Sequence, residues 1–163
     1  MIRLAEQKDA HAILAIYNDA ILHTTSVYKY EEETLGDRQQ WLLDKQAQGL
    51  PVFVLEEDGA VIGFATYGPF RVYPAYKFTI ENSIYVHPEH SGKGVASRLM
   101  KQLIVQSKEA GYKTMIACID ADNAASIKLH EKFGFTHSGT LSNVGFKFDK
   151  WLNLAMYQLD LQE

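Results

Sequence analysis

The spacing of apolar residues predicts two helices in the first third of the chain. Between Lys8 and Leu22, apolar residues recur every three or four positions, which gives a helix one buried face. Thr34 followed by Asp37 resembles a capping pair, so a second helix should begin there and run to Gly49. The N-terminal segment MIRLA is typical of a short edge strand.

The next segment predicts three strands. PVFVLEEDGAVIGFATYG has two apolar runs around an acidic turn that ends in glycine, which indicates a hairpin over residues 51–68. PFRVYPAY, which follows, is a proline-interrupted loop rich in aromatic residues. YKFTIENSIYVHP then alternates between apolar and polar positions and predicts a strand. One face of this strand should hold Phe78, Ile80, Ile84 and Val86.

The second half of the chain returns to mixed elements. A helix should follow the segment SGKG and stop at Gly111. TMIACID is a nearly unbroken apolar run, typical of a strand covered on both faces. NAASIKLHEKF predicts a short helix that is capped by Asn123 and ended by Gly134. TLSNVGFKF and WLNLAMYQLDL complete the chain as two strands around a turn at Asp149 and Lys150.

The predicted order of elements is therefore βααβββαβαββ. It corresponds to one α/β domain over residues 1–163, with a mixed central sheet of about seven strands and four helices. A hydrophobic fraction of 47% over 163 residues is enough for the core of a single domain.

Composition narrows the class of function. A formal net charge of −4 and a pI near 5.9 argue against a nucleic-acid partner, which would usually need a basic protein. Cys118 is the single cysteine, so no internal disulfide is possible, and no Cys/His spacing resembles a metal site. Cys118 is interpreted as a small buried hydrophobe rather than an acyl carrier. The sequence shows neither a signal-peptide pattern nor a membrane-spanning run, and we expect a cytoplasmic protein.

The segment SGKGVAS, residues 91–97, lies between a predicted strand and a predicted helix. A helix N-terminus leaves backbone N–H groups unpaired, and glycines let an anion approach them, which favours a phosphate site. A nucleoside-triphosphate loop would need Ser or Thr after Lys93, where this chain has Gly94. A dinucleotide fingerprint would need a third glycine where the chain has Ser97. A glycine-rich turn that only starts a helix is the remaining alternative.

Two motifs, in this order, resemble those of the GNAT superfamily of acetyl-CoA-dependent N-acetyltransferases. The pyrophosphate loop of that superfamily is Gln/Arg-x-x-Gly-x-Gly/Ala. SGKGVA matches its glycine and its final Ala96, with Ser91 in place of Gln or Arg. The later motif, Asn-x-x-Ser/Ala-x-x-Leu-Tyr/His-x-x-x-Gly-Phe, is present in full from Asn123 to Phe135. The resemblance covers essentially the whole chain.

Within the superfamily, the chain is most similar to the phosphinothricin and methionine sulfoximine N-acetyltransferases. The segments that carry this are AIYNDAI, RVYPAYKFTIENSIYVHPEHSGKG, ASIKLHEKFGF and GFKFDKW. The resemblance implies acetyl transfer from acetyl-CoA to the primary amine of a small amino-acid-like substrate. It implies direct attack in a ternary complex, no metal, a role in antibiotic or herbicide resistance, and a homodimer.

The resemblance also implies where acetyl-CoA binds. Its pantetheine arm pairs with the central strand at Ile84, Tyr85 and Val86, where a backbone N–H polarises the thioester carbonyl. Asn123 contacts the cofactor as the equivalent asparagine does in the family. The phosphates of acetyl-CoA contact the loop residues Gly92, Lys93, Gly94, Val95, Ala96 and Ser97.

Glu81 is the predicted general base. A half-buried strand carboxylate among aromatic residues should have a raised pKa, which suits proton abstraction, directly or through a water molecule. The alternative is a strand glutamate that faces solvent or forms an ion pair with Lys77 or Arg71. The match of TIENS to the Thr-Val-Glu strand of the family favours the base. His130 stands where many relatives have a tyrosine that protonates the departing thiolate, and a catalytic and a structural role are equally open.

The substrate residues are predicted from the chemistry of an amino acid. Its carboxylate needs an arginine or a set of donors, and Arg71 in the aromatic loop is the candidate. Relatives often have a second arginine two positions later, where this chain has Tyr73. Tyr28, Tyr76 and Asn82 are predicted wall residues, although Tyr73 and Tyr76 could equally pack within the loop or contact a second subunit.

Two other functions compete with this hypothesis. The same chemistry could act on a polyamine, an aminoglycoside or a protein N-terminus, although the proline-aromatic loop favours a small substrate. A non-catalytic acyl-CoA-binding module would keep the SGKGVA loop but would not need Glu81.

Overall fold

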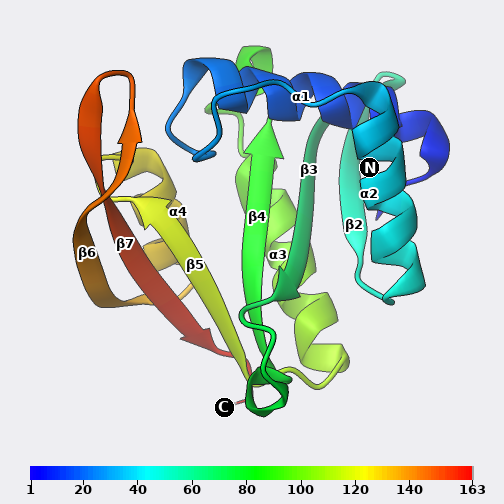
Figure 1. Cartoon of the computed structure of the whole chain (residues 1–163). Helices are drawn as coiled ribbons and strands as arrows, with labels where there is room; N and C mark the ends of the chain where they lie inside the picture. Colours follow the sequence, from blue (N-terminus) through cyan, green and yellow to red (C-terminus); the bar gives the residue numbers. More distant parts are fainter. Residues whose placement is uncertain (163) are drawn as a thin grey trace.

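The computed structural model describes residues 1–162, which form a seven-stranded sheet with the strand order β1-β2-β3-β4-β5-β7-β6 (Figure 1). Neighbouring strands are antiparallel except β4 and β5, which are parallel. The predicted order of elements and the mixed α/β sheet are confirmed. The strands are β1 (Ile2–Leu4), β2 (Val52–Glu57), β3 (Ala60–Pro69), β4 (Thr79–Val86), β5 (Thr114–Asp120), β6 (Thr136–Lys147) and β7 (Lys150–Asp160).

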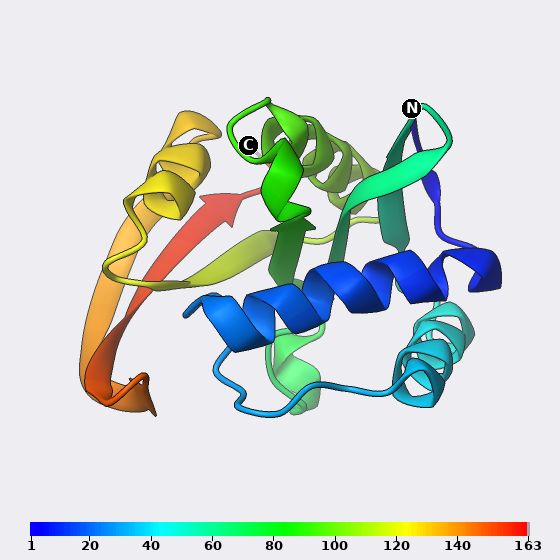
Figure 2. The same ribbon diagram turned by 90° about the horizontal axis from the view of Figure 1, so that it is seen from above.

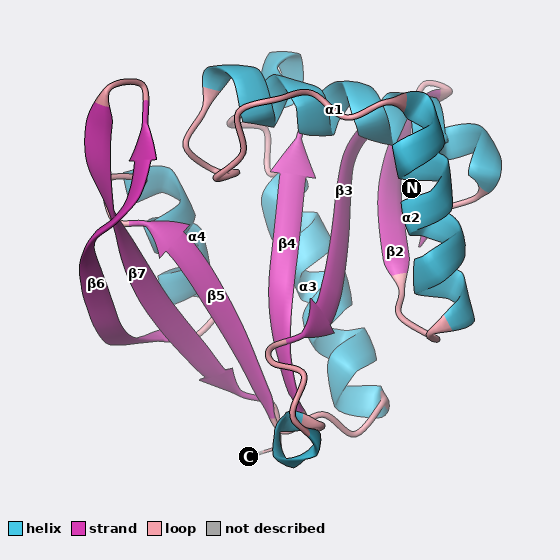
Figure 3. Cartoon of the chain, in the orientation of Figure 1, coloured by secondary structure: helices cyan, strands magenta, loops and turns pink. Residues whose placement is uncertain are grey.

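Four α-helices cover the two faces of the sheet. α1 (Ala10–His23) and α2 (Leu35–Ala47) lie on one face, and α3 (Val95–Glu109) and α4 (Ala124–Lys132) lie on the other (Figures 1, 2 and 3). Both predicted caps are present, because Thr34 accepts from the N–H of Asp37 and Asn123 accepts from the N–H of Ser126. Among the described residues, no helix has both the length and the apolar character needed to cross a bilayer.

Each face of the sheet has its own apolar core. On the α3 face, Leu99 and Leu103 pack with Met115 of β5, and all three side chains are fully buried. On the α1 face, Ile13 packs with Phe64 of β3. Because both faces are filled, the central strands are rigid supports for the residues at their ends.

Two local predictions are wrong. Phe78 was predicted on the apolar face of the strand, but it lies before β4 and is 55% exposed. The alternation of apolar and polar residues begins in the loop, before the residues that pair with neighbouring strands. The last turn is Phe148 and Asp149, one residue earlier than predicted. Both residues have positive φ angles, 53° and 58°, as a two-residue hairpin turn of this hand requires. Few non-glycine residues adopt that conformation, so the sequence pattern did not indicate Phe148.

Candidate active site

The central parallel pair of strands separates after three residues. β4 and β5 pair from Thr79–Glu81 to Thr114–Ile116 and then diverge, which opens a fork in the sheet (Figure 1). β4 continues to Val86 with β3 as its partner on the other side. The fork begins at Glu81, so this residue stands where the two strands part.

The fork leaves main-chain groups of β4 without a neighbouring strand. Alternate residues of a strand direct their N–H and C=O groups to opposite sides. His87 donates its N–H to β3, whereas the carbonyl of Phe78 accepts on the β5 side. By this alternation, Ile84 and Val86 direct their main-chain groups into the fork, where an extended ligand could pair with them like a further strand.

A cavity of about 640 Å³ occupies the fork. It is lined by β4 from Glu81 to Val86, by the loop before α3, and by parts of β5 and α4. Of the predicted cofactor residues, Lys93 is exposed and does not line it. The others do: Ile84, Tyr85, Val86, Gly92, Gly94, Val95, Ala96, Ser97 and Asn123.

The loop at the start of α3 has the geometry of an anion site. Gly92 and Gly94 have φ angles of 75° and 79°, and a Cβ on either would point into open space. Gly94 is the N-cap of α3, and no acidic side chain lies in the first turn of the helix. The exposed N–H groups and the positive end of the helix dipole therefore face the cavity unopposed, which suits a pyrophosphate.

Two lysines of α4 add positive charge to the same end of the cavity. Lys128 and Lys132 both line it, and the Nζ of Lys132 lies 3.4 Å from the Oγ of Ser97. These two lysines were not predicted from the sequence. Their spacing of four places them on one face of the helix that Asn123 caps, and this spacing was the available signal.

Glu81 is partly buried at the junction of the fork, on the face of β4 that α1 covers. Burial raises the pKa of its carboxyl group, while the Cys118 thiol and the charge of Arg71 partly offset that rise. No ion pair to Glu81 occurs among residues 1–162, which removes the alternative of a paired surface glutamate. The raised pKa of the carboxyl group suits a base that works near neutral pH.

Cys118 lies beside this carboxylate and is not the buried hydrophobe that was predicted. Its Sγ is 3.8 Å from Oε1 of Glu81, and it lines the cavity. The end of the run TMIACID therefore borders the cavity, whereas a strand covered on both faces was predicted. Burial and the neighbouring Glu81 raise the pKa of the thiol to about 11, so it is protonated at neutral pH and donates to Glu81.

His130 is 5% exposed and is engaged at both ring nitrogens. Nδ1 lies 2.7 Å from the carbonyl of Ser126, which only accepts, so Nδ1 carries the hydrogen. Nε2 then accepts from the Nδ2 of Asn82 at 3.2 Å. Burial lowers the pKa of the ring, which keeps it neutral. In this arrangement His130 orients Asn82 and has no free proton that faces the cavity.

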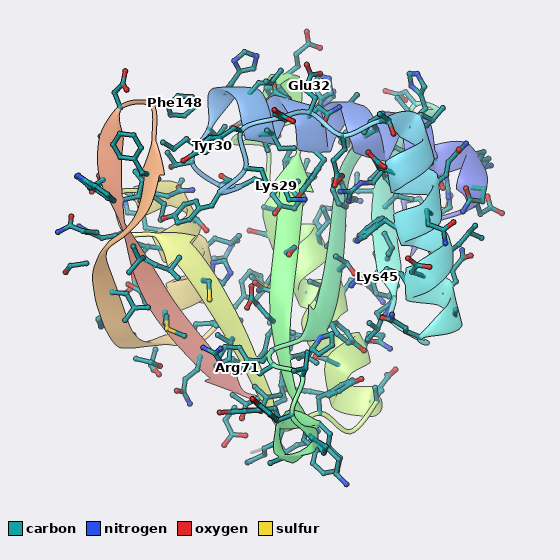
Figure 4. All side chains as sticks on the ribbon, viewed as in Figure 1. Lys29, Tyr30, Glu32, Lys45, Arg71 and Phe148 are labelled. Atoms are coloured by element: carbon teal, nitrogen blue, oxygen red, sulfur yellow. The ribbon has the colours of Figure 1, made fainter. Side chains whose placement is uncertain are left out.

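Of the predicted substrate residues, Asn82 alone lines the cavity. Arg71 lies at the foot of the fork, with its guanidinium over the ring of Phe70 at 5.1 Å (Figure 4). Tyr76 packs edge-on against Phe70 at 5.7 Å, and Tyr73 is 70% exposed. Tyr28 is 40% exposed, and burial together with the charge of Asp120 raises the pKa of its hydroxyl group.

The opposite wall of the cavity carries a carboxylate that was not predicted from the sequence. Asp120, at the end of β5, is 6% exposed and lines the cavity together with Ser26. The Oγ1 of Thr25 donates to the carboxylate of Asp120. Within residues 1–162, no three acidic, histidine or cysteine side chains gather as metal ligands would.

Comparisons with known proteins show which family and which structures this chain resembles. The acetyltransferase (GNAT) family matches residues 11–135. A relative from Salmonella typhimurium, an L-methionine sulfoximine/L-methionine sulfone acetyltransferase, is 41% identical over 99% of this chain and 95% of its own. An N-acetyltransferase crystal structure from Staphylococcus aureus Mu50 has 58% identity and a TM-score of 0.99, and the match covers 99% and 98% of the two chains. A phosphinothricin acetyltransferase from Sinorhizobium meliloti, solved with acetyl-CoA, has 34% identity and a TM-score of 0.96, covering 100% and 89%.

Proposed function

The chain belongs to the acetyltransferase (GNAT) family, and we propose that it transfers the acetyl group of acetyl-CoA to the primary amine of a small amino-acid-like molecule. Methionine sulfoximine, methionine sulfone and phosphinothricin are the proposed type of substrate, because the named relatives act on them.

The observation that carries this proposal is the edge of β4 that has no neighbouring strand and that begins at Glu81, where β5 diverges. An extended pantetheine arm fits beside Ile84 and Val86, and the glycine loop and the lysines of α4 suit its phosphates. In this proposal the thioester lies next to Glu81. Acetyl-CoA supplies the activated acetyl group.

The residues of the fork then divide the reaction between them. Glu81 takes a proton from the amine, directly or through a water molecule, and the freed nitrogen attacks the thioester carbon. A main-chain N–H of β4 donates to the carbonyl oxygen as negative charge develops on it. The carbon–sulfur bond breaks, and the amide and the thiolate of coenzyme A are the products. A thiol has a pKa near 8.5, so the thiolate can leave before it takes a proton from water.

His130 has a positioning role in this proposal. Because its ring is neutral and both nitrogens are engaged, it holds Asn82 rather than giving a proton to the thiolate. Arg71 is the proposed partner of the substrate carboxylate, since its charge lies close enough to Glu81 to lower the pKa of that carboxyl group.

A thiol-release assay with acetyl-CoA tests the proposed function. The panel contains methionine sulfoximine, methionine sulfone, phosphinothricin, the common amino acids, a polyamine, an aminoglycoside and a peptide N-terminus. We expect turnover on the first three compounds. Turnover on another amine alone would assign the same chemistry to that substrate. No turnover on any compound, with acetyl-CoA still bound in calorimetry, would contradict the proposal and favour a non-catalytic acyl-CoA-binding module.

A homodimer is the proposed assembly, and exposed apolar residues of the β6–β7 hairpin support it. Light scattering on the purified protein tests the mass of the particle. A cytoplasmic location and a single domain over residues 1–163 stay predictions. The exposed side chains of the hairpin are Leu141, Val144, Phe146, Phe148 and Trp151.

A further inference from the structure

Lys147, the last residue of β6, is a buried lysine without an acidic partner. Its side chain is 4% exposed, and no ion pair involves it among the described residues. The Nζ atom donates to the carbonyls of Ile21 at 2.6 Å, Thr24 at 2.7 Å and Val27 at 2.7 Å. All three N–H groups of the ammonium are therefore used on one stretch of main chain. Burying a charge is costly, and here these three bonds compensate it.

The three carbonyls belong to the end of α1 and the start of the segment that follows. Ile21 lies in the last turn of α1, where carbonyls have no partner within the helix. Thr24 is the C-cap of α1, and Val27 lies in the segment of residues 24–33, which we call the α1–α2 loop. Lys147 thus caps α1 from more than 120 residues away and folds the α1–α2 loop back onto the hairpin.

The same hairpin holds the α1–α2 loop at two more points. The hydroxyl of Tyr30 donates to the carbonyl of Phe146, and Figure 4 shows Tyr30 near Phe148 at the tip of the hairpin. The ring of Tyr28 lies directly over Gly145. A Cβ at Gly145 would be 2.7 Å from Cε2 of that ring, closer than side chains approach.

The loop also reaches the cavity. Ser26 lines the cavity, and Thr25 donates to Asp120, which lines it too. Thr25 and Ser26 stand between the two carbonyls that Lys147 holds, those of Thr24 and Val27. The position of this wall of the cavity is therefore tied to the position of the ammonium.

We propose that Lys147 is a positioning residue that holds Thr25 and Ser26 against Asp120, so that they form the wall of the amine subsite. The inference rests on the proposed acetyl transfer and extends it to a residue outside the cavity. A purely structural lysine would affect the stability of the whole chain. A positioning lysine affects the KM of the amine and leaves acetyl-CoA binding intact, because the residues proposed to bind acetyl-CoA lie on β4, the glycine loop and α4.

Lys147→Met is the test, with Lys150→Met as its matched control. Lys150 is paired with Lys147 across the same hairpin, but its side chain is 56% exposed and forms only a 3.6 Å ion pair with Asp122. For Lys147→Met we expect the KM of the amine to rise ~10- to ~100-fold, as a displaced binding group causes. The dissociation constant of acetyl-CoA should stay within about twofold in calorimetry. Lys150→Met should match the wild type in both measurements.

Gly145→Ala displaces the same α1–α2 loop without removing a buried charge. If Lys147→Met does not fold, this variant still tests whether the position of the loop controls the KM of the amine. The φ angle of Gly145 is ordinary, so the added methyl group acts only by displacing the ring of Tyr28. We expect a smaller rise in the KM of the amine and no change in acetyl-CoA binding. The inference would be overturned if the KM of the amine is unchanged in both variants. It would also be overturned if affinity for the amine and affinity for acetyl-CoA fall equally, and in either case the proposed function stands.

Hydrogen exchange separates failure of this inference from failure of the proposed function. If the wild type acetylates no amine, the proposed function fails, yet the amides of residues 24–33 still report on the loop. Faster exchange there in Lys147→Met than in Lys150→Met supports the positioning role. Equal exchange in the two variants overturns it.

Discussion

The two sides of the cavity are built in different ways. The side proposed for acetyl-CoA comes mainly from one continuous stretch, residues 82–97, which runs through β4, the glycine loop and the start of α3. The side proposed for the amine is lined by Ser26 of the α1–α2 loop and by the end of β5, and the β6–β7 hairpin holds that loop from outside the cavity. The first is local in sequence, and the second depends on contacts such as the one between Lys147 and Ile21, 126 residues apart.

This difference explains why one side could be predicted in detail. A strand, a glycine turn and a helix N-terminus create an anion site through neighbouring main-chain groups, whatever packs behind them. A wall made from segments that are far apart in the sequence depends on how each one packs. Substitutions on the first side should therefore change only the affinity for acetyl-CoA, and substitutions on the second side should change only the affinity for the amine.

Glu81→Gln should have the largest effect, because Glu81 stands where the two sides meet. Removing a general base lowers kcat by about 10²- to 10⁴-fold, whereas acetyl-CoA binding should be unchanged. Burial raises the pKa of this carboxyl group, and only its ionised form accepts a proton. Activity of the wild type should therefore rise with pH through that raised pKa, and Glu81→Gln should lose this limb. Steady-state rates across pH measure both effects, and an unchanged kcat in Glu81→Gln would exclude Glu81 as the base.

Gly94→Val should separate the acetyl-CoA side from the amine side. A branched residue at a φ of 79° is strained by about 1–2 kcal/mol, and its side chain would extend into open space at a position that lines the cavity. We expect acetyl-CoA affinity to fall about 10- to 100-fold, with the KM of the amine unchanged. Gly111→Val is the control, since Gly111 ends the same helix at a φ of 88° and does not line the cavity. Equal losses of affinity in both variants would mean that strain alone is responsible.

Arg71→Gln tests the amine side. Losing a charge-assisted hydrogen bond should raise the KM of an amino-acid substrate about tenfold. The KM of an amine that matches this substrate but lacks its carboxylate should be unchanged. Lys77→Gln removes an exposed charge from the same loop and should leave the KM of both amines unchanged. If Arg71→Gln affects both amines equally, the guanidinium does not bind the carboxylate.

Cys118→Ala should have the smallest effect. The thiol donates to Glu81 and lowers the pKa of that carboxyl group, so its loss should move the acidic limb of the pH profile to higher pH. The rate on the alkaline plateau should stay the same. Cys118→Ser keeps a donor and should leave the limb near its original position. A lower plateau in Cys118→Ala would instead assign the thiol a direct part in the reaction.

The prediction from sequence succeeded where a signal repeats over short distances. The caps at Thr34 and Asn123, the hairpin over 51–68 and the order of elements all follow from periodicity and turn chemistry. It failed where a residue adopts a conformation that its type disfavours, as at Phe148. It also failed at Cys118, because an apolar run does not reveal that its end borders a cavity.

The sequence by itself determined the order of elements and the glycine loop, because both depend on bonds and spacings between near neighbours. The choice of Glu81 as the base came from the family resemblance and stays a prediction. Only the tertiary structure decided where β4 and β5 part, which nitrogen of His130 carries the hydrogen, and that Lys147 reaches the α1–α2 loop. Those features depend on which groups are buried together. Burial sets the cost of every unpaired charge and donor, and it is a property of the packed chain rather than of any one segment.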